Sequence, residues 1–421
     1  MRGSVVRRCL RPDLMTANLS KNFSAVCILA AGVGAAMHIG KLPPSLPVLG
    51  QVLGVTLLEA GFLLSSMQMA GMLLGLMTGL AVQRVGLKRS MILGLLLVAL
   101  GSALGTLAQS AAWLLATRAM EGLGFLWVVL PAPALLRQSV GPQRVNRVMG
   151  LWGAYMPLGT SLGLLLGPYM MHLAVPDMGW RVWWGVLSGW CALLALLVLW
   201  LVPTDARPAA LSAPNQKILS LTLRSGPAWL LALSFAAYSG QWLAVVGFLP
   251  TIYALAGVAS ALAGWLTALA AAANIVGNVA AGRLLEQGVR PLTLLRTAFV
   301  AMALGAVLAF TPQLDARLQY AAVLVFSALG GLIPATLFSL SVRLAPSPAA
   351  VSSTVGWIQQ WSAIGQFTAP PLVAWLAVLA GGWQWTGAVC VACCVAGVLL
   401  AGAIHRALEH ANSRALHAHA A

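Results

Sequence analysis

The chain has 421 residues, of which 60% are hydrophobic and only 8% are charged. A soluble domain of this length does not require so much apolar surface, so the composition excludes an ordinary soluble globular protein. The formal net charge of +16 is compatible on its own with nucleic-acid binding, so the positions of the basic residues decide what the charge means.

Twelve apolar segments follow one another along the chain, separated by short polar loops. About 20 apolar residues in a helix cross the roughly 30 Å hydrocarbon core of a bilayer, and in lipid a helix satisfies its own backbone hydrogen bonds. The sequence therefore predicts an all-α membrane protein with 12 transmembrane helices. These helices are expected at residues 23–48, 57–83, 90–109, 112–137, 146–172, 181–203, 227–253, 258–285, 292–311, 318–343, 350–379 and 383–404.

The basic residues of the loops fall almost entirely on alternate sides of these segments. If the N-terminus is cytoplasmic, only Arg181 and Arg317 lie in outside loops, while Lys41 and Arg118 lie at membrane depth. This asymmetry is the positive-inside pattern, so both termini are expected in the cytoplasm and the multi-pass chain in the cytoplasmic (inner) membrane. The surplus charge is then a topology signal, which predicts contact with the lipid bilayer and none with nucleic acid.

A polar interval divides the chain into two sets of six segments. The expected parts are a cytoplasmic N-terminal tail at 1–22, a six-helix bundle at 23–203, a cytoplasmic linker at 204–226, a second six-helix bundle at 227–404 and a cytoplasmic tail at 405–421.

The two sets repeat each other at a nearly constant offset. Pro133 recurs as Pro334, 201 positions later, and Gly163 recurs as Gly365, 202 positions later. Because each half has six crossings, both halves insert with the same orientation, which gives two parallel-related bundles. Two such bundles can rock around a shared site at the membrane midplane, and this geometry favours a transporter over a fixed pore.

The loop after the second segment carries a recognisable spacing of glycines and cations. It reads Gly79-Leu-Ala-Val-Gln83-Arg84-Val-Gly86-Leu-Lys88-Arg89. This spacing resembles the signature G-x-x-x-D-R-x-G-x-R-R of the major facilitator superfamily, except that Gln83 stands in place of the acid. Two further patterns of that family appear as Arg118-Ala-Met-Glu121-Gly122-Leu-Gly124 and as Gly159-x-x-x-Gly163-x-x-x-Gly167-Pro168. The resemblance covers residues 20–405 and implies the twelve-helix fold of these transporters.

In that family the loop acid helps to latch one half to the other when the protein faces outward. Gln83 carries no charge, and Glu286 occupies the equivalent place in the second half, so the resemblance implies that Glu286 contributes more to the latch. The residues to which the resemblance assigns conformational gating are Gly79, Gln83, Arg84, Gly86, Lys88, Arg89 and Glu286.

Three other stretches resemble the cyanate and nitroimidazole transporters within the same family. They are His38-Ile-Gly40-Lys41-Leu-Pro43-Pro44, Trp152-Gly-Ala-Tyr155-Met-Pro157, and Gln359-Gln360 with Ala369-Pro370-Pro371.

Few ionisable residues are expected at membrane depth, where a charge costs about 2.5 to 3.5 kcal/mol and requires a partner or a watery cavity. Arg118 and Glu121 are spaced i, i+3 and can face each other. One interpretation is a structural pair, with Lys41 reaching the outer surface; the other is a central cavity in which Lys41 and Arg118 bind a small anion. Because Arg keeps its proton, Glu121 and Glu59 are the predicted proton-coupling residues.

The second half offers neutral amides, which can bind a solute or join helices to one another. The predicted substrate-binding residues are Lys41, Arg118, Tyr155, Gln241, Asn274, Gln359 and Gln360. Pro168 and Pro370 lie within predicted spans, where a missing backbone N–H permits bending of the helix.

Signals for catalysis or metal binding are sparse. Cys390, Cys393 and Cys394 lie in an apolar helix without a nearby His, which is typical of thiols that fill a core, so no metal and no cofactor are expected. The sequence has no phosphate-binding loop, and the predicted spans contain only two acids. We therefore assign no catalytic residues, and a membrane-embedded enzyme is the alternative from another functional class.

The leading interpretation is a monomeric secondary active transporter of a small solute, working by alternating access and driven by protons. Basic residues in the cavity favour a small organic anion as the solute. The Gly-Pro run of the fifth segment resembles that of exporters, so a drug or metabolite exporter of the same fold is the alternative.

Overall fold

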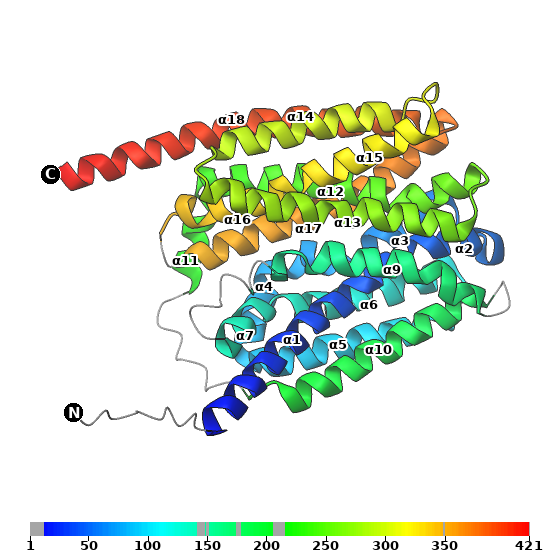
Figure 1. Ribbon diagram of the computed structural model, residues 1–421, viewed down its shortest axis with the longest axis horizontal. Coiled ribbons are helices and arrows are strands. Elements are labelled where there is room, and N and C mark those ends of the chain that lie inside the picture. The colour runs from blue at the N-terminus through cyan, green and yellow to red at the C-terminus, as the bar shows by residue number, and fades with distance from the viewer. Residues whose placement is uncertain are drawn as a thin grey trace, which may run out of the picture.

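The computed structural model describes residues 12–140, 148, 151–173, 178–204, 215–347 and 350–420, in which the regular elements are helices (Figure 1). The first half contains α1 (Pro12–Gly40), the 3-10 helix η1 (Pro43–Ser45), α2 (Leu46–Leu53), α3 (Leu57–Ser66), α4 (Met69–Val85), α5 (Leu87–Gly105), α6 (Ala111–Val129), α7 (Ala132–Ser139), α9 (Tyr155–His172) and α10 (Gly179–Leu201). The second half contains α11 (Asn215–Leu223), α12 (Gly226–Leu255), α13 (Ser260–Glu286), α14 (Pro291–Ala309), α15 (Ala316–Gly330), α16 (Leu332–Leu344), α17 (Val351–Ala380) and α18 (Gln384–Ala420).

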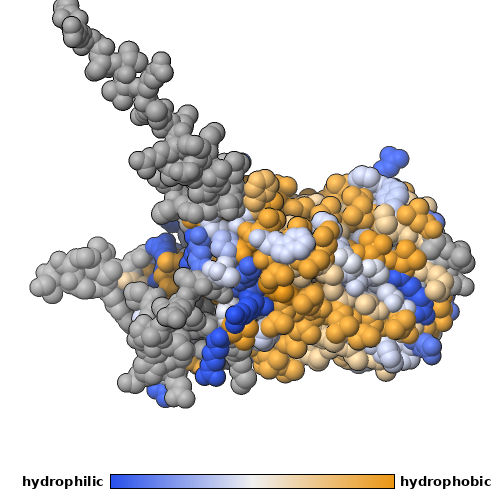
Figure 2. Space-filling view, turned by 90° about the horizontal axis from the view of Figure 1, so that it is seen from below, coloured by the Kyte–Doolittle hydropathy of each residue, from blue (hydrophilic) through white to orange (hydrophobic). Residues whose placement is uncertain are grey.

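The helices of the described chain account for the predicted spans. Ten helical segments are long and apolar enough to cross a membrane, and the bent pair of α3 and α4 makes eleven. The remaining predicted span is α9, which packs against α1 and α13. Figure 2 shows a broad apolar surface between more polar surfaces at the two ends of the molecule. The prediction of an all-α membrane protein is confirmed.

Several predicted helices are interrupted, which the apolar pattern did not indicate. The first span ends as α1 at Gly40 and continues through η1, which begins at Pro43, into α2. The fourth span changes from α6 to α7 at Pro131. Proline lacks the backbone N–H that continues a helix, which explains both breaks. The second span bends by 45° between α3 and α4, and α18 continues as a helix to Ala420.

Motif glycines lie where helix backbones touch. A Cβ atom on Gly124 of α6 would lie 2.6 Å from the carbonyl oxygen of Gly94 in α5. A Cβ atom on Gly159 of α9 would lie 2.4 Å from the carbonyl oxygen of Val33 in α1. Both positions therefore require glycine, because small residues let membrane helices approach closely.

The internal repeat is visible as the same contact in both halves. Cys191 Sγ lies 3.3 Å from His38 Nε2 in the first half, and Cys394 Sγ lies 3.4 Å from Gln241 Oε1 in the second. The second pair follows the first by 203 positions at both residues. Equivalent helices therefore pack in the same way in both halves, as a parallel repeat requires.

The two halves contact each other at the end of the molecule that carries α2 and α3, at the right in Figure 1. A Cβ atom on Gly61 of α3 would lie 2.8 Å from Pro371 Cα of α17, and one on Gly264 of α13 would lie 2.7 Å from Pro168 Cγ of α9. At the same contact Ser161 Oγ donates a hydrogen bond of 2.9 Å to the carbonyl of Ala268. This end of the molecule is closed by close packing of backbone and small side chains.

Candidate functional site

A cavity of about 800 Å³ lies between the two halves. Its first wall comes from α4, α6 and α9, and its second from α12, α13, α16 and α17. It extends to Arg283 and Glu286 at the C-terminal end of α13, away from the contact that closes the other end. A cavity of this size, open toward one end and lined by both halves, is suited to a small solute.

Three of the predicted substrate-binding residues line this cavity, namely Tyr155 of α9, Asn274 of α13 and Gln359 of α17. Gln241 does not line it: this residue is buried, donates to the carbonyl of Ala237 and accepts from Cys394. The neighbouring predicted residue, Gln360, lies at the interface between α17 and α4.

Amide groups join the halves along α4 and α17. Gln68 Nε2 donates to Gln366 Oε1 at 3.1 Å, and Gln360 Nε2 donates to the carbonyl of Met72 at 2.9 Å. Gln68 was missed in the sequence analysis, although the polar run Ser65-Ser66-Met67-Gln68 inside an apolar span is a signal that could have identified it. Gln68 lies at the bend between α3 and α4, so it contacts the other half where its own span changes direction.

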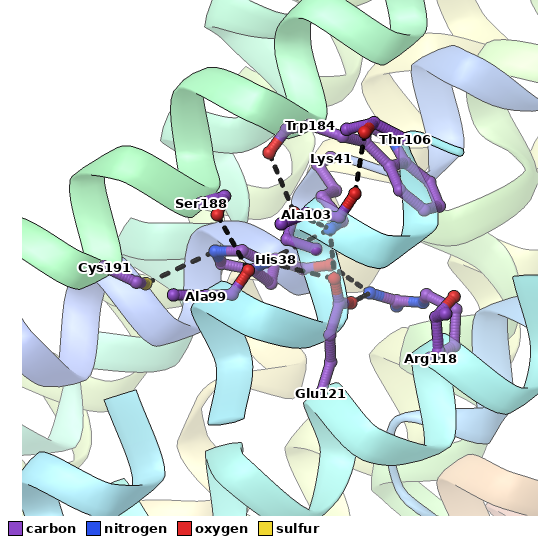
Figure 3. Close-up of polar contacts among 12 residues, drawn as sticks. His38, Lys41, Ala99, Ala103, Thr106, Arg118, Glu121, Trp184, Ser188 and Cys191 are labelled. Atoms are coloured by element: carbon purple, nitrogen blue, oxygen red, sulfur yellow. Dashed lines mark hydrogen bonds and ion pairs between the residues drawn. The ribbon is translucent and has the colours of Figure 1, made fainter. Parts of the chain in front are cut away.

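Lys41 and Arg118 do not line the cavity, because both are completely buried within the first half. Glu121 lies between them: Lys41 Nζ forms a short ion pair with Glu121 Oε1, and Arg118 Nη1 pairs with Glu121 Oε2 at 2.6 Å (Figure 3). Arg118 Nη1 also donates to the carbonyl of His38 at 2.7 Å. The structure thus brings together the two predicted cations and one of the two predicted carboxylates in a buried charge cluster, defined here as Lys41, Arg118 and Glu121.

The ammonium group of Lys41 also contacts residues outside the charge cluster. Besides Glu121, its Nζ atom contacts Ser102 Oγ at 2.7 Å and His38 Nδ1 at 3.2 Å. It also lies 4.1 Å from the ring centroid of Trp184, a cation–π distance. Ser102 in turn donates to the carbonyl of Trp184. An ammonium group has three donors, and each of them has an acceptor here.

The charge cluster is not neutral when all its members carry their ordinary charges. Lys41 and Arg118 supply two positive charges against one negative charge on Glu121, and all three are 0% exposed. Arg118 Nε and Nη2 have no hydrogen-bond partner among the described residues. A buried net charge is costly, so a neutral arrangement of the cluster or the close approach of an anion is favoured.

Glu59 is not part of this cluster. It lies in the first turn of α3, where its carboxylate accepts from the backbone N–H of Thr56 at 2.8 Å while the Thr56 hydroxyl accepts from the backbone N–H of Glu59. This reciprocal pair is a capping box, and it gives the carboxylate a role in starting the helix.

The gating loop is described only in part. Gly86 connects α4 to α5 with φ of 98°, a conformation that favours glycine, and Lys88 Nζ donates to the carbonyl of Leu199 at 2.8 Å. Arg84 and Arg89 are exposed. The side-chain environments of Gly79 and Gln83 lie outside the described part of the chain.

Glu286 is exposed and makes no ion pair with the described residues. The predicted bending residues Pro168 and Pro370 lie inside the continuous helices α9 and α17, at the contact that closes the far end of the cavity.

Comparisons with known proteins agree on the family. The model of the Major Facilitator Superfamily matches residues 25–367. The cyanate transport protein CynX of Escherichia coli is 27% identical over 245 residues, which cover 58% of this chain and 61% of that protein. The 2-nitroimidazole transporter of Escherichia coli is 26% identical over 227 residues, which cover 54% of this chain and 56% of that protein. The matches therefore span less than two thirds of these relatives.

Solved structures show the same fold. A bacterial homologue of the human lysosomal transporter Spinster, crystallised in an inward-facing and occupied conformation, superposes with a TM-score of 0.69 at 16% identity, covering 96% of both chains. The two helical bundles, the cavity between them and the family match lead to one conclusion: the chain belongs to the major facilitator superfamily, whose members are transporters of small solutes and not enzymes.

Proposed function

We propose that the protein is a secondary active transporter that moves a small solute across the cytoplasmic membrane by alternating access, with coupling to protons. The observation that carries this proposal is the cavity between the halves, open toward the C-terminal end of α13 and closed at the other end by α3, α9, α13 and α17. With both termini in the cytoplasm, this arrangement is the inward-facing state. The names of the two relatives, a cyanate transport protein and a 2-nitroimidazole transporter, support a small solute.

The expectation of an anionic solute depended on Lys41 and Arg118 facing the cavity. Both side chains are enclosed in the first half, so in this state they cannot touch a solute in the cavity. Their position suits a role in coupling better than a role in binding.

Proton coupling is assigned to the charge cluster, and within it to Lys41. An arginine side chain is always charged in proteins and cannot carry the coupled proton. Glu121 is the shared acceptor for the two cations. Removal of one proton from Lys41 leaves a neutral Arg118–Glu121 pair in place of a buried net charge. Among the described residues, the other groups near Lys41 are His38 of α1, Ser102 of α5, and Trp184 and Cys191 of α10.

The cluster is also positioned to affect the cavity. Glu121 is followed in α6 by Gly122, which lines the cavity, and a Cβ atom on Gly122 would lie 2.3 Å from the carbonyl of Met67 beside the bend between α3 and α4. A change of charge on Lys41, the partner of Glu121, therefore acts close to a tight contact beside the bend.

The first prediction concerns alternating access. Leu64 Cδ1 of α3 lies 3.1 Å from the position that a Cβ atom on Gly247 of α12 would take. A Leu64→Cys/Gly247→Cys pair, introduced into a cysteine-free chain, should therefore form a disulfide across the closed end. Oxidation should abolish labelling of a third cysteine, Gln359→Cys, by a membrane-impermeant thiol reagent added outside. Labelling by the same reagent added inside should be unchanged. A reductant should restore labelling from outside.

The matched control for that experiment is each single cysteine with Gln359→Cys, which oxidation should leave unchanged. Outside labelling that persists in the fully oxidised double variant would show that the cavity is reached by another route, and alternating access about this contact would be rejected.

The second prediction concerns the latch. Glu286→Gln should lower outside labelling of Gln359→Cys several-fold, because the carboxylate helps to hold the inner end closed only while the outer end is open. Glu409→Gln is the control, since Glu409 is an exposed acid in α18 whose partner is His405. Equal labelling in Glu286→Gln and in the parent would remove Glu286 from the mechanism.

The third prediction concerns coupling. The inside-to-outside labelling ratio of Gln359→Cys should change with pH in the parent, because Lys41 exchanges its proton as the protein changes state. Lys41→Met keeps a neutral Arg118–Glu121 pair and should give a ratio that does not vary with pH. Glu59→Gln, which alters only the cap of α3, should behave as the parent. A pH-dependent ratio in Lys41→Met would assign coupling elsewhere.

A further inference from the structure

We infer that the cavity binds an uncharged solute with a flat aromatic ring and a hydrogen-bonding substituent, the class of an aromatic amide. This inference rests on the proposed function, since it takes the cavity to be the transport site. It follows from three properties of the cavity wall, namely its charge, its rings and its unused polar groups.

Charge is nearly absent from the wall. Among the described lining residues the acids and bases are Arg283 and Glu286, which are exposed at the mouth, are spaced i, i+3 and have opposite signs. The deeper wall is built of apolar, amide, hydroxyl and aromatic side chains. Lys41 and Arg118 are enclosed and already paired with Glu121. An ion that enters a cavity with such a wall loses its hydration shell without gaining a counter-charge, so a neutral solute is favoured.

Both halves present aromatic rings to the cavity. In the first half, the Phe125 and Tyr155 rings have centroids 6.4 Å apart. In the second half, Phe235 is parallel to Tyr238 at 6.0 Å and edge-on to Phe338 at 5.4 Å. A flat ring between these two walls can stack on one and meet the edges of the other, which are the arrangements that aromatic pairs prefer.

Several polar groups of the wall are already occupied. Asn274 donates to the Tyr238 hydroxyl at 2.8 Å and to the carbonyl of Ser327, and its own oxygen accepts from Asn278. Gln366 accepts a hydrogen bond from Gln68 and donates one to the Ser362 hydroxyl. These amides maintain the shape of the wall and have little capacity left for a solute.

Two polar groups of the wall are available, one from each half. The Tyr155 hydroxyl and the Gln359 side chain line the cavity, and neither makes a hydrogen bond to a described residue. A hydroxyl both donates and accepts, and a primary amide has two donors and one acceptor. A carboxamide on the solute matches this mixture, whereas a carboxylate can only accept and has no cation here. Contact with both groups would also link α9 to α17 across the cavity.

The test compares isosteric probes on the purified full-length chain. Binding of radiolabelled benzamide is measured directly, and unlabelled benzoate, nicotinamide and cyclohexanecarboxamide serve as competitors. Benzamide and nicotinamide should bind at least about tenfold more tightly than benzoate, which differs in charge, and than cyclohexanecarboxamide, which lacks the ring. Benzoate that binds as well as benzamide, or an absence of benzamide binding at millimolar concentration, would overturn the inference.

Variants show whether the probe occupies this cavity. Tyr155→Phe and Gln359→Leu should each weaken benzamide binding by about threefold to tenfold, because each removes one hydrogen bond. Tyr169→Phe is the matched control, since the Tyr169 hydroxyl accepts from Trp265 away from the cavity. Unchanged benzamide affinity in both cavity variants would place the probe elsewhere and also overturn the inference.

These results separate the solute class from the transport cycle. The disulfide experiment uses no solute, so a closed end that controls outside labelling keeps the proposed function even if benzamide fails to bind. Conversely, benzamide binding in a protein whose disulfide has no effect on labelling would support the cavity chemistry and reject the cycle.

Discussion

The contact between the two halves at one end of the molecule is the constraint on which the other functional features depend. It is made by backbone and small side chains, as at Gly61 against Pro371 and Gly264 against Pro168. Van der Waals packing of this kind, with a few neutral hydrogen bonds such as that from Ser161 to Ala268, is gained or lost at modest cost. The same helices that close this end diverge around the cavity. A contact built from charges would resist separation more strongly and would make the alternation of states more difficult.

The halves share a packing pattern but differ in chemistry. His38 with Cys191 in the first half corresponds to Gln241 with Cys394 in the second, yet among the described residues the buried ion pairs lie beside the first pair. All members of the charge cluster belong to the first half, so movement of one half relative to the other does not break its ion pairs. Coupling therefore requires that the surroundings of the cluster, beside the bend between α3 and α4, differ between the two states, while the neutral network of the second half maintains the wall that faces the solute.

Much of the fold could be predicted from the sequence, because the length of an apolar run and the requirement to satisfy the backbone leave few alternatives in lipid. The motif glycines were recognised by resemblance, and the structure gives the physical reason at Gly124 and Gly159, where no side chain fits. The break in the first span was missed, although Pro43 lacks the backbone N–H that would continue the helix. Glu59 was interpreted as a membrane-depth acid, although Thr56 three residues earlier is a signal for a helix cap.

The candidate site was less predictable. The sequence places Lys41, Arg118 and Glu121 at membrane depth, but it does not determine which way a side chain points when a helix is apolar on all sides. Ile28 and Leu42 are as deeply buried as Lys41, so hydropathy could not separate the core of the first half from the cavity wall. For the same reason Phe125 and Phe338 could not be distinguished from rings that face lipid, and the cavity could only be found from the packing of the helices.

The most direct test of rocking between two states measures both ends of the molecule at once. Spin labels on exposed sites would report the outer end through Gln51 and Leu255 and the inner end through Gln138 and Gln287, using electron–electron distance measurements. A change of pH or the addition of benzamide should then change the two distances in opposite directions. Whenever the inner distance shortens, the outer distance should lengthen, and the reverse. Distances that change in the same direction, or independently of each other, would contradict the account.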